Sequence, residues 1–180
     1  MMNSIFMNYL ELYGEPTRKA KYKSPDGKVI QIFKWDEDQT DEGVVMYATM
    51  GASITLGDKE ERCEFFIGLT PDADDIADAL AEVALYGNGT THVPNSGDTV
   101  TLSYDLWHGT KARSFMFTDG DEIVPSTKDE HGRQIWFIQL VPLFEEELSY
   151  KKEYGEDALW GEFENAEVPY WSSSRSSLFE

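Results

Sequence analysis

The run from Arg133 to Leu143, RQIWFIQLVPL, limits the folds open to this chain more than any other stretch. It is rich in β-branched and aromatic residues, which predicts a β-strand. The run is apolar at nearly every position instead of at alternate positions, which is typical of a strand covered on both faces. We therefore expect a central strand of a sheet that has other elements packed on each side.

The remaining segments place helices before, between and after groups of strands. Helical spacing of apolar residues predicts an N-terminal helix over residues 4–13. Thr70 as N-cap and Pro71 as first helical residue predict a helix that runs to about Tyr86 and ends at residues 87–89. This order predicts an α+β fold with a mixed, largely antiparallel central sheet and helices packed on it. The other predicted elements are a loop at 14–27, strands at 28–35, 43–50, 61–69, 98–104 and 112–117, and helices at 144–152 and 156–163.

The length of 180 residues suits a single domain. We assign residues 1–165 to that domain and residues 166–180 to a C-terminal tail. The Ser-rich composition of the tail favours flexibility, whereas Trp171, Leu178 and Phe179 favour docking onto the domain. The sequence is compatible with both alternatives.

The chain is strongly acidic, with 34 Asp and Glu against 15 Lys and Arg and a net charge of −19. The charge is uneven: residues 1–34 hold six basic and three acidic residues, which gives +3 and leaves −22 for the rest. A field of this sign repels nucleic acid and anionic membranes, so we expect neither as a partner. It would speed association with a basic protein. An equally simple interpretation is that the charge only keeps the protein soluble.

The sequence predicts a cytoplasmic protein. Its first residues lack the basic start, the continuous apolar core and the small-residue cleavage site of an export signal. No stretch is long and apolar enough to suggest a membrane span. The single cysteine, Cys63, excludes an internal disulfide and fits a reducing compartment.

No motif for catalysis or metal binding is complete. Gly51-Ala52-Ser53 begins like a nucleophile elbow, but Thr55 stands where that motif needs a second glycine. One cysteine and three scattered histidines do not make a zinc site, and the Asp36-x-Asp38 start of a calcium loop is not continued. We therefore predict no enzyme activity, no cofactor and no bound metal. Gly51 is expected to form a turn instead.

Four segments taken in order carry a family pattern: Tyr47–Ser53, Cys63–Ile67, Ile76–Tyr86, and Phe137–Leu148 followed by Gly155 and Leu159. Over residues 2–165 they resemble the suppressor-of-fused-like domain family. The resemblance implies an α+β domain that has no known enzymatic activity and acts by binding proteins. The stand-alone chain is similar to the bacterial form, which occurs as immunity proteins, or antitoxins, of polymorphic toxin systems. The positions that match the family pattern, and to which it gives a structural role, are Gly51, Ser53, Glu64, Pro142 and Gly155.

The hypothesis that follows is an immunity-type protein that neutralises a cognate toxin, a basic nuclease, by occupying its surface. The predicted contact patch is an acidic turn with Trp35 beside it as an aromatic anchor. Its acidic members are Asp36, Glu37, Asp38, Asp41 and Glu42. Two alternatives stay open: a small-ligand-binding protein or enzyme with a pocket near Trp107-His108, and a scaffold subunit unrelated to toxins.

Overall fold

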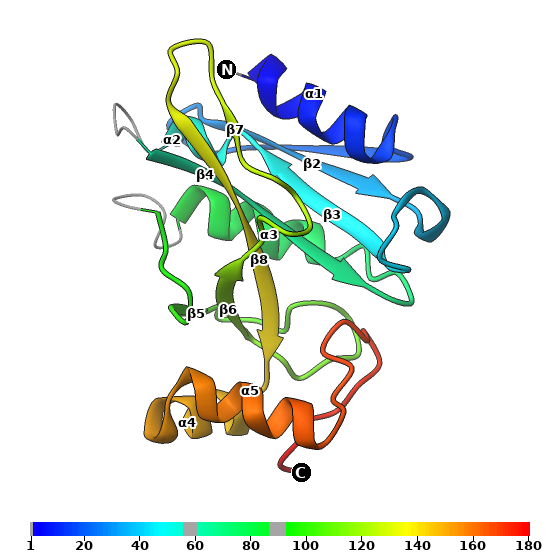
Figure 1. The fold of residues 1–180 in the computed structure, drawn as a ribbon, viewed down its shortest axis with the longest axis vertical. Helices are drawn as coiled ribbons and strands as arrows, with labels where there is room; N and C mark the ends of the chain where they lie inside the picture. The colour runs from blue at the N-terminus through cyan, green and yellow to red at the C-terminus, as the bar shows by residue number, and fades with distance from the viewer. Residues whose placement is uncertain (1, 56–60, 87–92) are drawn as a thin grey trace.

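The computed structural model describes residues 2–55, 61–86 and 93–180 and builds them around one eight-stranded sheet (Figure 1). The strand order is β1-β2-β3-β4-β8-β6-β5, and the short β7 pairs with β8 outside this path. Every pairing is antiparallel except that of β4 with β8, which is parallel. The mixed, largely antiparallel sheet is thereby confirmed. The strands are β1 Arg18–Lys23, β2 Val29–Trp35, β3 Val45–Met50, β4 Glu61–Leu69, β5 Thr99–Thr101, β6 Ser114–Asp119, β7 Thr127–Lys128 and β8 Gln134–Leu143.

Helices cover both faces of the sheet and one of its ends. Helix α1 packs on one face and α3 on the opposite face, while α4 and α5 lie beyond the C-terminal end of β8 (Figure 1). The helix bounds are α1 Met2–Tyr13, α2 Ala52–Thr55, α3 Ile76–Tyr86, α4 Glu145–Tyr154 and α5 Glu156–Asn165, with a 3-10 turn at Glu37–Gln39. This arrangement confirms the α+β class, and no helix among the described residues is long and apolar enough to cross a membrane.

Strand β2 carries apolar side chains on both faces of the sheet. Ile30 and Ile32 belong to the cluster under α3, whereas Phe33 and Trp35 belong to the cluster under α1. Successive side chains of a strand point to opposite faces, so an apolar residue at nearly every position requires a cover on each side. The same reasoning holds for β8, which lies between β4 and β6 with most of its side chains buried. The predicted central strand is confirmed.

The predicted loop at 14–27 is wrong in part, because it contains β1. This strand is at the edge of the sheet and pairs only with β2 in the sheet order. Ala20 and Tyr22 face the core cluster under α3, and the other four residues of the strand are exposed and basic. An edge strand exposes much of its surface, so its sequence lacks the apolar run that identifies interior strands.

The predicted start of the central helix at Thr70 and Pro71 is also wrong, since α3 begins at Ile76. The Thr70 backbone instead pairs with the C-terminal tail: its N–H donates to the Trp171 carbonyl at 2.9 Å, and its carbonyl accepts from Ser173 N–H at 3.0 Å. A long-range pairing has overridden the local helix-start signal. Residues 87–89, predicted to end this helix, lie outside the described residues.

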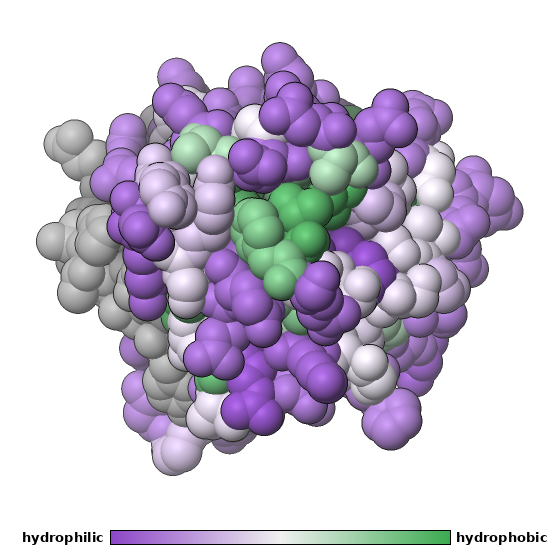
Figure 2. Space-filling model, turned by 90° about the horizontal axis from the view of Figure 1, so that it is seen from below, coloured by the Kyte–Doolittle hydropathy of each residue, from purple (hydrophilic) through white to green (hydrophobic). Residues whose placement is uncertain are grey.

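The C-terminal tail, residues 166–180, packs against the domain. Trp107 Nε1 donates to the Ser173 carbonyl at 2.9 Å, and Ser173 Oγ donates to the Pro71 carbonyl at 2.7 Å. Phe179 stacks on Tyr150 of α4 with ring centroids 4.8 Å apart. The end of the molecule where the chain terminates is largely hydrophilic, with a hydrophobic patch near its centre (Figure 2). The structure therefore has the docked form of the tail.

Candidate functional site

The turn after β3 is organised by a buried carboxylate, that of Glu64 on β4. Glu64 Oε1 accepts hydrogen bonds from Gly51 N–H at 2.9 Å, Ser53 N–H at 3.2 Å and Ser53 Oγ at 3.0 Å. Glu64 Oε2 accepts from Thr49 Oγ1 at 2.6 Å and from Ala52 N–H at 3.2 Å. Gly51, Ser53 and Glu64, which the family pattern places in two separate segments, therefore meet in space. The carboxylate also satisfies backbone N–H groups that the start of α2 leaves free.

This turn is closed to substrates. Ser53 and Glu64 are both fully buried. Burial raises the pKa of the Glu64 carboxyl, and the hydrogen bonds from Thr49, Gly51 and Ser53 oppose that rise. The Ser53 hydroxyl is engaged as a donor to Glu64, so Ser53 is not an exposed nucleophile. We propose that this group of residues shapes the backbone, as the family resemblance implies.

Gly51 offers a first prediction. Its φ is +123°, and a β-carbon added there would lie 2.5 Å from the Val29 carbonyl oxygen of β2. We expect Gly51→Ala to lower the free energy of unfolding by about 2–3 kcal/mol, through backbone strain and overlap with a neighbouring strand. Urea denaturation followed by tryptophan fluorescence measures the change. Gly109→Ala is the control, because its β-carbon would meet no atom within 4 Å although its φ is also positive.

The predicted acidic patch is a real surface feature. Asp36, Glu37, Asp38, Asp41 and Glu42 are all exposed on the connection from β2 to β3. The first three line an open hollow of about 400 Å³ together with Asp72, which comes from a distant part of the chain. Glu37 Oε1 also accepts a hydrogen bond from Thr70 Oγ1 at 2.7 Å. The fold thus adds to the negative charge that the turn carries by itself.

Trp35, predicted as the aromatic anchor of this patch, is fully buried and therefore cannot fill that role. Its Nε1 donates to the Gly14 carbonyl at 2.9 Å, and its ring packs on Tyr9 and Tyr13 of α1. Trp35 is the last residue of β2, whose side chains alternate between two covered faces, so its side chain points into the core. The acidic residues that follow Trp35 in the sequence suggested an exposed position instead. An exposed tryptophan is supplied instead by Trp171, which is 42% exposed on the docked tail.

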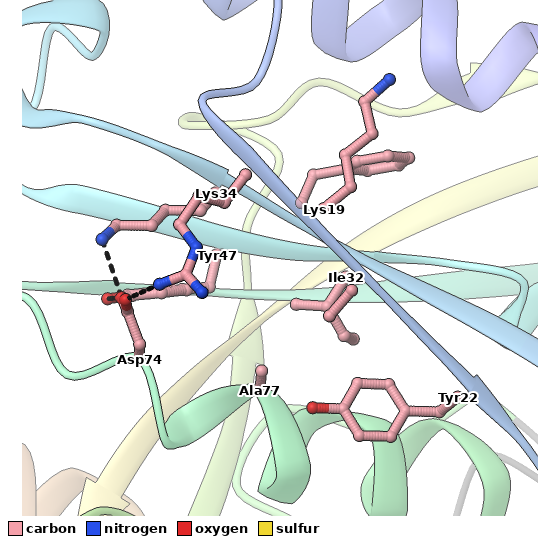
Figure 3. A pocket seen from close by; sticks show the side chains of 10 residues that line it. Lys19, Tyr22, Ile32, Lys34, Tyr47, Asp74 and Ala77 are labelled. Atoms are coloured by element: carbon pink, nitrogen blue, oxygen red, sulfur yellow. Dashed lines mark hydrogen bonds and ion pairs between the residues drawn. The ribbon is translucent and has the colours of Figure 1, made fainter.

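Part of the positive charge of the N-terminal segment is used within the chain. Lys34 Nζ lies 2.7 Å from Asp74 Oδ1 and 3.0 Å from Asp72 Oδ2, and Arg18 also pairs with Asp74. Figure 3 shows Lys34 and a guanidinium group converging on Asp74 at the rim of a hollow of about 150 Å³. Burial lowers the pKa of Lys34, but the hydrogen bonds to Asp74 and Asp72 outweigh it and raise that pKa. These pairs fix β1 and β2 to the loop before α3.

The tail is held by a buried ion pair between Arg175 and Glu147 of α4. Arg175 Nη1 lies 2.6 Å from Glu147 Oε1, and Nη2 lies 3.0 Å from Oε2, which makes the pair bidentate. Arg175 Nη2 also donates to the Pro142 carbonyl at 2.9 Å. Gly155, at φ +98°, separates α4 from α5 and donates its N–H to the Lys151 carbonyl. Pro142 therefore lies near the end of β8, just before the chain enters the helices, and Gly155 lies at the turn between the two helices.

The alternative pocket near Trp107-His108 is an open hollow of about 350 Å³. Trp107 is buried beneath the tail, and His108 is exposed, with its backbone N–H donating to Asp75 Oδ2 at 3.2 Å. Within the described ranges, no three His, Cys, Asp or Glu side chains are grouped so that they could hold a metal ion. His92, one of the three histidines of the sequence, lies outside these ranges. None of the described residues that line this hollow is a Ser, Thr or Cys.

These features define the class of the protein: an α+β domain with a mixed sheet, a buried glutamate that organises one turn, and acidic side chains exposed at another. The family model described as Suppressor of fused protein (SUFU) matches residues 26–176. The chain belongs to the suppressor of fused family. The comparison with curated proteins found no match.

Three solved structures share the fold. A suppressor of fused homologue from Neisseria gonorrhoeae has 17% sequence identity and a TM-score of 0.70, with 98% of this chain and 95% of that chain covered. A chain of the Sufu–Fu complex has 13% identity and a TM-score of 0.65, with coverages of 99% and 90%. Drosophila Suppressor of Fused has 14% identity and a TM-score of 0.69, with coverages of 99% and 51%. The chain thus spans about half of the Drosophila protein.

Proposed function

We propose that this protein is a binding module that neutralises a basic protein partner, a toxin domain of the nuclease type, by occupying its surface. The single observation that carries the proposal is the exposed acidic turn, residues 36–42, on a chain of net charge −19. Family membership supports a protein-binding role, because one structure of similar fold is described as the Sufu–Fu complex. This chain would likewise act by binding another protein.

The charge explains why a nuclease fits as the partner. A nuclease needs Lys and Arg to hold the phosphates of its substrate. An acidic protein is attracted by the same side chains and competes with the substrate for them. Complementary fields also raise the association rate, which matters when the partner is a catalyst that damages the cell continuously. The acidic turn would make the contact and exclude the nucleic acid.

The test is co-purification with the product of the neighbouring gene, followed by titration of the complex against salt. We expect the affinity to fall about tenfold or more between 50 and 500 mM NaCl, because the Debye length shortens from about 14 Å to about 4 Å. Co-expression should also restore growth to cells that carry the toxin gene. If neither binding nor protection is found, the proposed function is wrong. An affinity that does not change with salt concentration would contradict the role proposed for charge.

Matched variants separate the turn from the overall field. Asp38→Asn with Asp41→Asn removes two charges from the acidic turn. Glu11→Gln with Glu164→Gln removes two exposed charges from α1 and α5. We expect the first pair to weaken the complex about tenfold and the second pair about twofold or less, since only close charges contribute strongly at physiological salt. Equal losses in both would assign the effect to net charge alone.

A further inference from the structure

A second hollow lies beside the acidic turn, on the sheet face that α1 covers, and we call it the Trp171 hollow. Its volume is about 210 Å³. Apolar side chains from or beside β3, from β4 and from the segment before β7 form one part of its lining. Polar and aromatic side chains form the other part. It is lined by Glu42, Val44, Met46, Phe66, Gly68, Ile123, Gln139, Tyr170 and Trp171. The hollow therefore joins the acidic turn to the C-terminal tail.

Glycines keep the walls of the hollow in place. A β-carbon at Gly68 would lie 2.5 Å from Val44 Cγ2, so a side chain there would displace Val44. A β-carbon at Gly120 would overlap the Phe66 ring. Val44 and Phe66 can lie in these positions only because Gly68 and Gly120 carry no side chain. The two glycines thus set the positions of two of the side chains that line the hollow.

The docked tail presents an aromatic ring at the hollow in a fixed position. The Trp171 carbonyl accepts from Thr70 N–H at 2.9 Å, and its ring packs edge-on against Tyr170 with centroids 5.0 Å apart. Tyr170 in turn packs against Trp160 of α5 at 5.4 Å. The side chain of Trp171 is nevertheless 42% exposed. A rigid, partly exposed tryptophan is the typical anchor of a binding surface, because little entropy is lost when a partner covers it.

The charge at the hollow has one sign. Glu42 lies at the hollow, Asp41 is its neighbour in the chain, and none of the described residues that line it is basic. Partial burial and the charge of Asp41 raise the pKa of Glu42, although backbone hydrogen bonds oppose the rise. A cation placed there would relieve this unfavourable environment. The hollow thus combines an apolar wall, an aromatic face and a carboxylate.

We propose that the Trp171 hollow binds one arginine side chain of the protein partner. The aliphatic stem would lie on Val44 and Met46, and the guanidinium would stack on Trp171 and pair with Glu42. The hollow, of about 210 Å³, has room for the side chain of an arginine. The proposal deepens the proposed function, because it names the group by which a basic partner is recognised.

The hollow can be tested without any partner. The probe is n-butylguanidinium, which reproduces the arginine side chain together with its α-carbon, and n-butylurea serves as its neutral counterpart. Each is titrated into the ¹⁵N-labelled full chain, and the amide shifts of Glu42 and Gly68 and the indole shift of Trp171 are followed by NMR. We expect saturable shifts at these groups, with n-butylguanidinium bound about fivefold or more tightly than n-butylurea.

Variants identify the contributing groups. Glu42→Gln and Trp171→Ala should each weaken n-butylguanidinium about fivefold. Glu61→Gln, an exposed single-charge change at the opposite end of β4, should leave the affinity unchanged. Equal binding of both probes, or equal losses in Glu42→Gln and Glu61→Gln, would overturn the proposal. Because these titrations contain no partner protein, they can fail while the proposed function holds, and they can succeed while it fails.

Discussion

Replacing Glu64 by glutamine is expected to lower the free energy of unfolding by about 3–5 kcal/mol, although it changes only one atom of the side chain. Three donors point at Oε1, and two point at Oε2. A glutamine amide must place its NH₂ group on one side or the other. In either orientation at least one buried backbone N–H, that of Ala52 or those of Gly51 and Ser53, faces another donor and is left unsatisfied.

Urea denaturation measures this loss, and Glu61→Gln on the same strand is the matched control. Glu61 is exposed, so the same substitution should change the free energy of unfolding by less than about 0.5 kcal/mol. Glu64→Asp is a second variant: it keeps the charge but shortens the side chain, so its loss reports geometry alone. A Glu64→Gln protein as stable as the parent would contradict the role given to the carboxylate.

The interior of the fold could be read from the sequence because its strands must be apolar. The run at 133–143 became β8, and the predicted strands at 28–35, 43–50 and 61–69 became β2, β3 and β4 within one or two residues. Strands at the edges of the sheet were either missed or predicted to be too long. The basic β1 was missed, and the strand predicted at 98–104 is only Thr99–Thr101. Edge strands bury less surface, so hydrophobic pattern constrains them less.

Local signals failed where distant segments meet. Thr70 and Pro71 have the residue types of a helix start, but the tail pairs with the Thr70 backbone and α3 begins later. Trp35 adjoins an acidic turn, but its place on β2 directs it into the core. In both cases a tertiary contact, invisible in the neighbouring residues, decides the outcome. The aromatic group beside the acidic turn comes from Trp171, more than a hundred residues further along the chain.

Removing the cation of the buried ion pair, by Arg175→Met, is expected to lower the free energy of unfolding by about 3–5 kcal/mol. The Glu147 side chain is fully buried, and that of Arg175 is only 6% exposed. The substitution would leave the carboxylate buried with hydrogen bonds only from Phe144 N–H at 3.0 Å and Leu178 N–H at 3.1 Å. The tail would lose its charged attachment to α4, so proteolysis should also begin there.

Two controls make the measurement specific. Arg113→Met removes a pair of similar length, with Arg113 Nε 2.8 Å from Asp105 Oδ1, but one whose side chains are 56% and 46% exposed. Its expected cost is below about 1 kcal/mol, because water screens an exposed pair. In the double variant Arg175→Met with Glu147→Gln, no buried charge remains unpaired, so stability should partly return. Equal costs for Arg175→Met and Arg113→Met, or no recovery in the double variant, would show that packing and not the ion pair holds the tail.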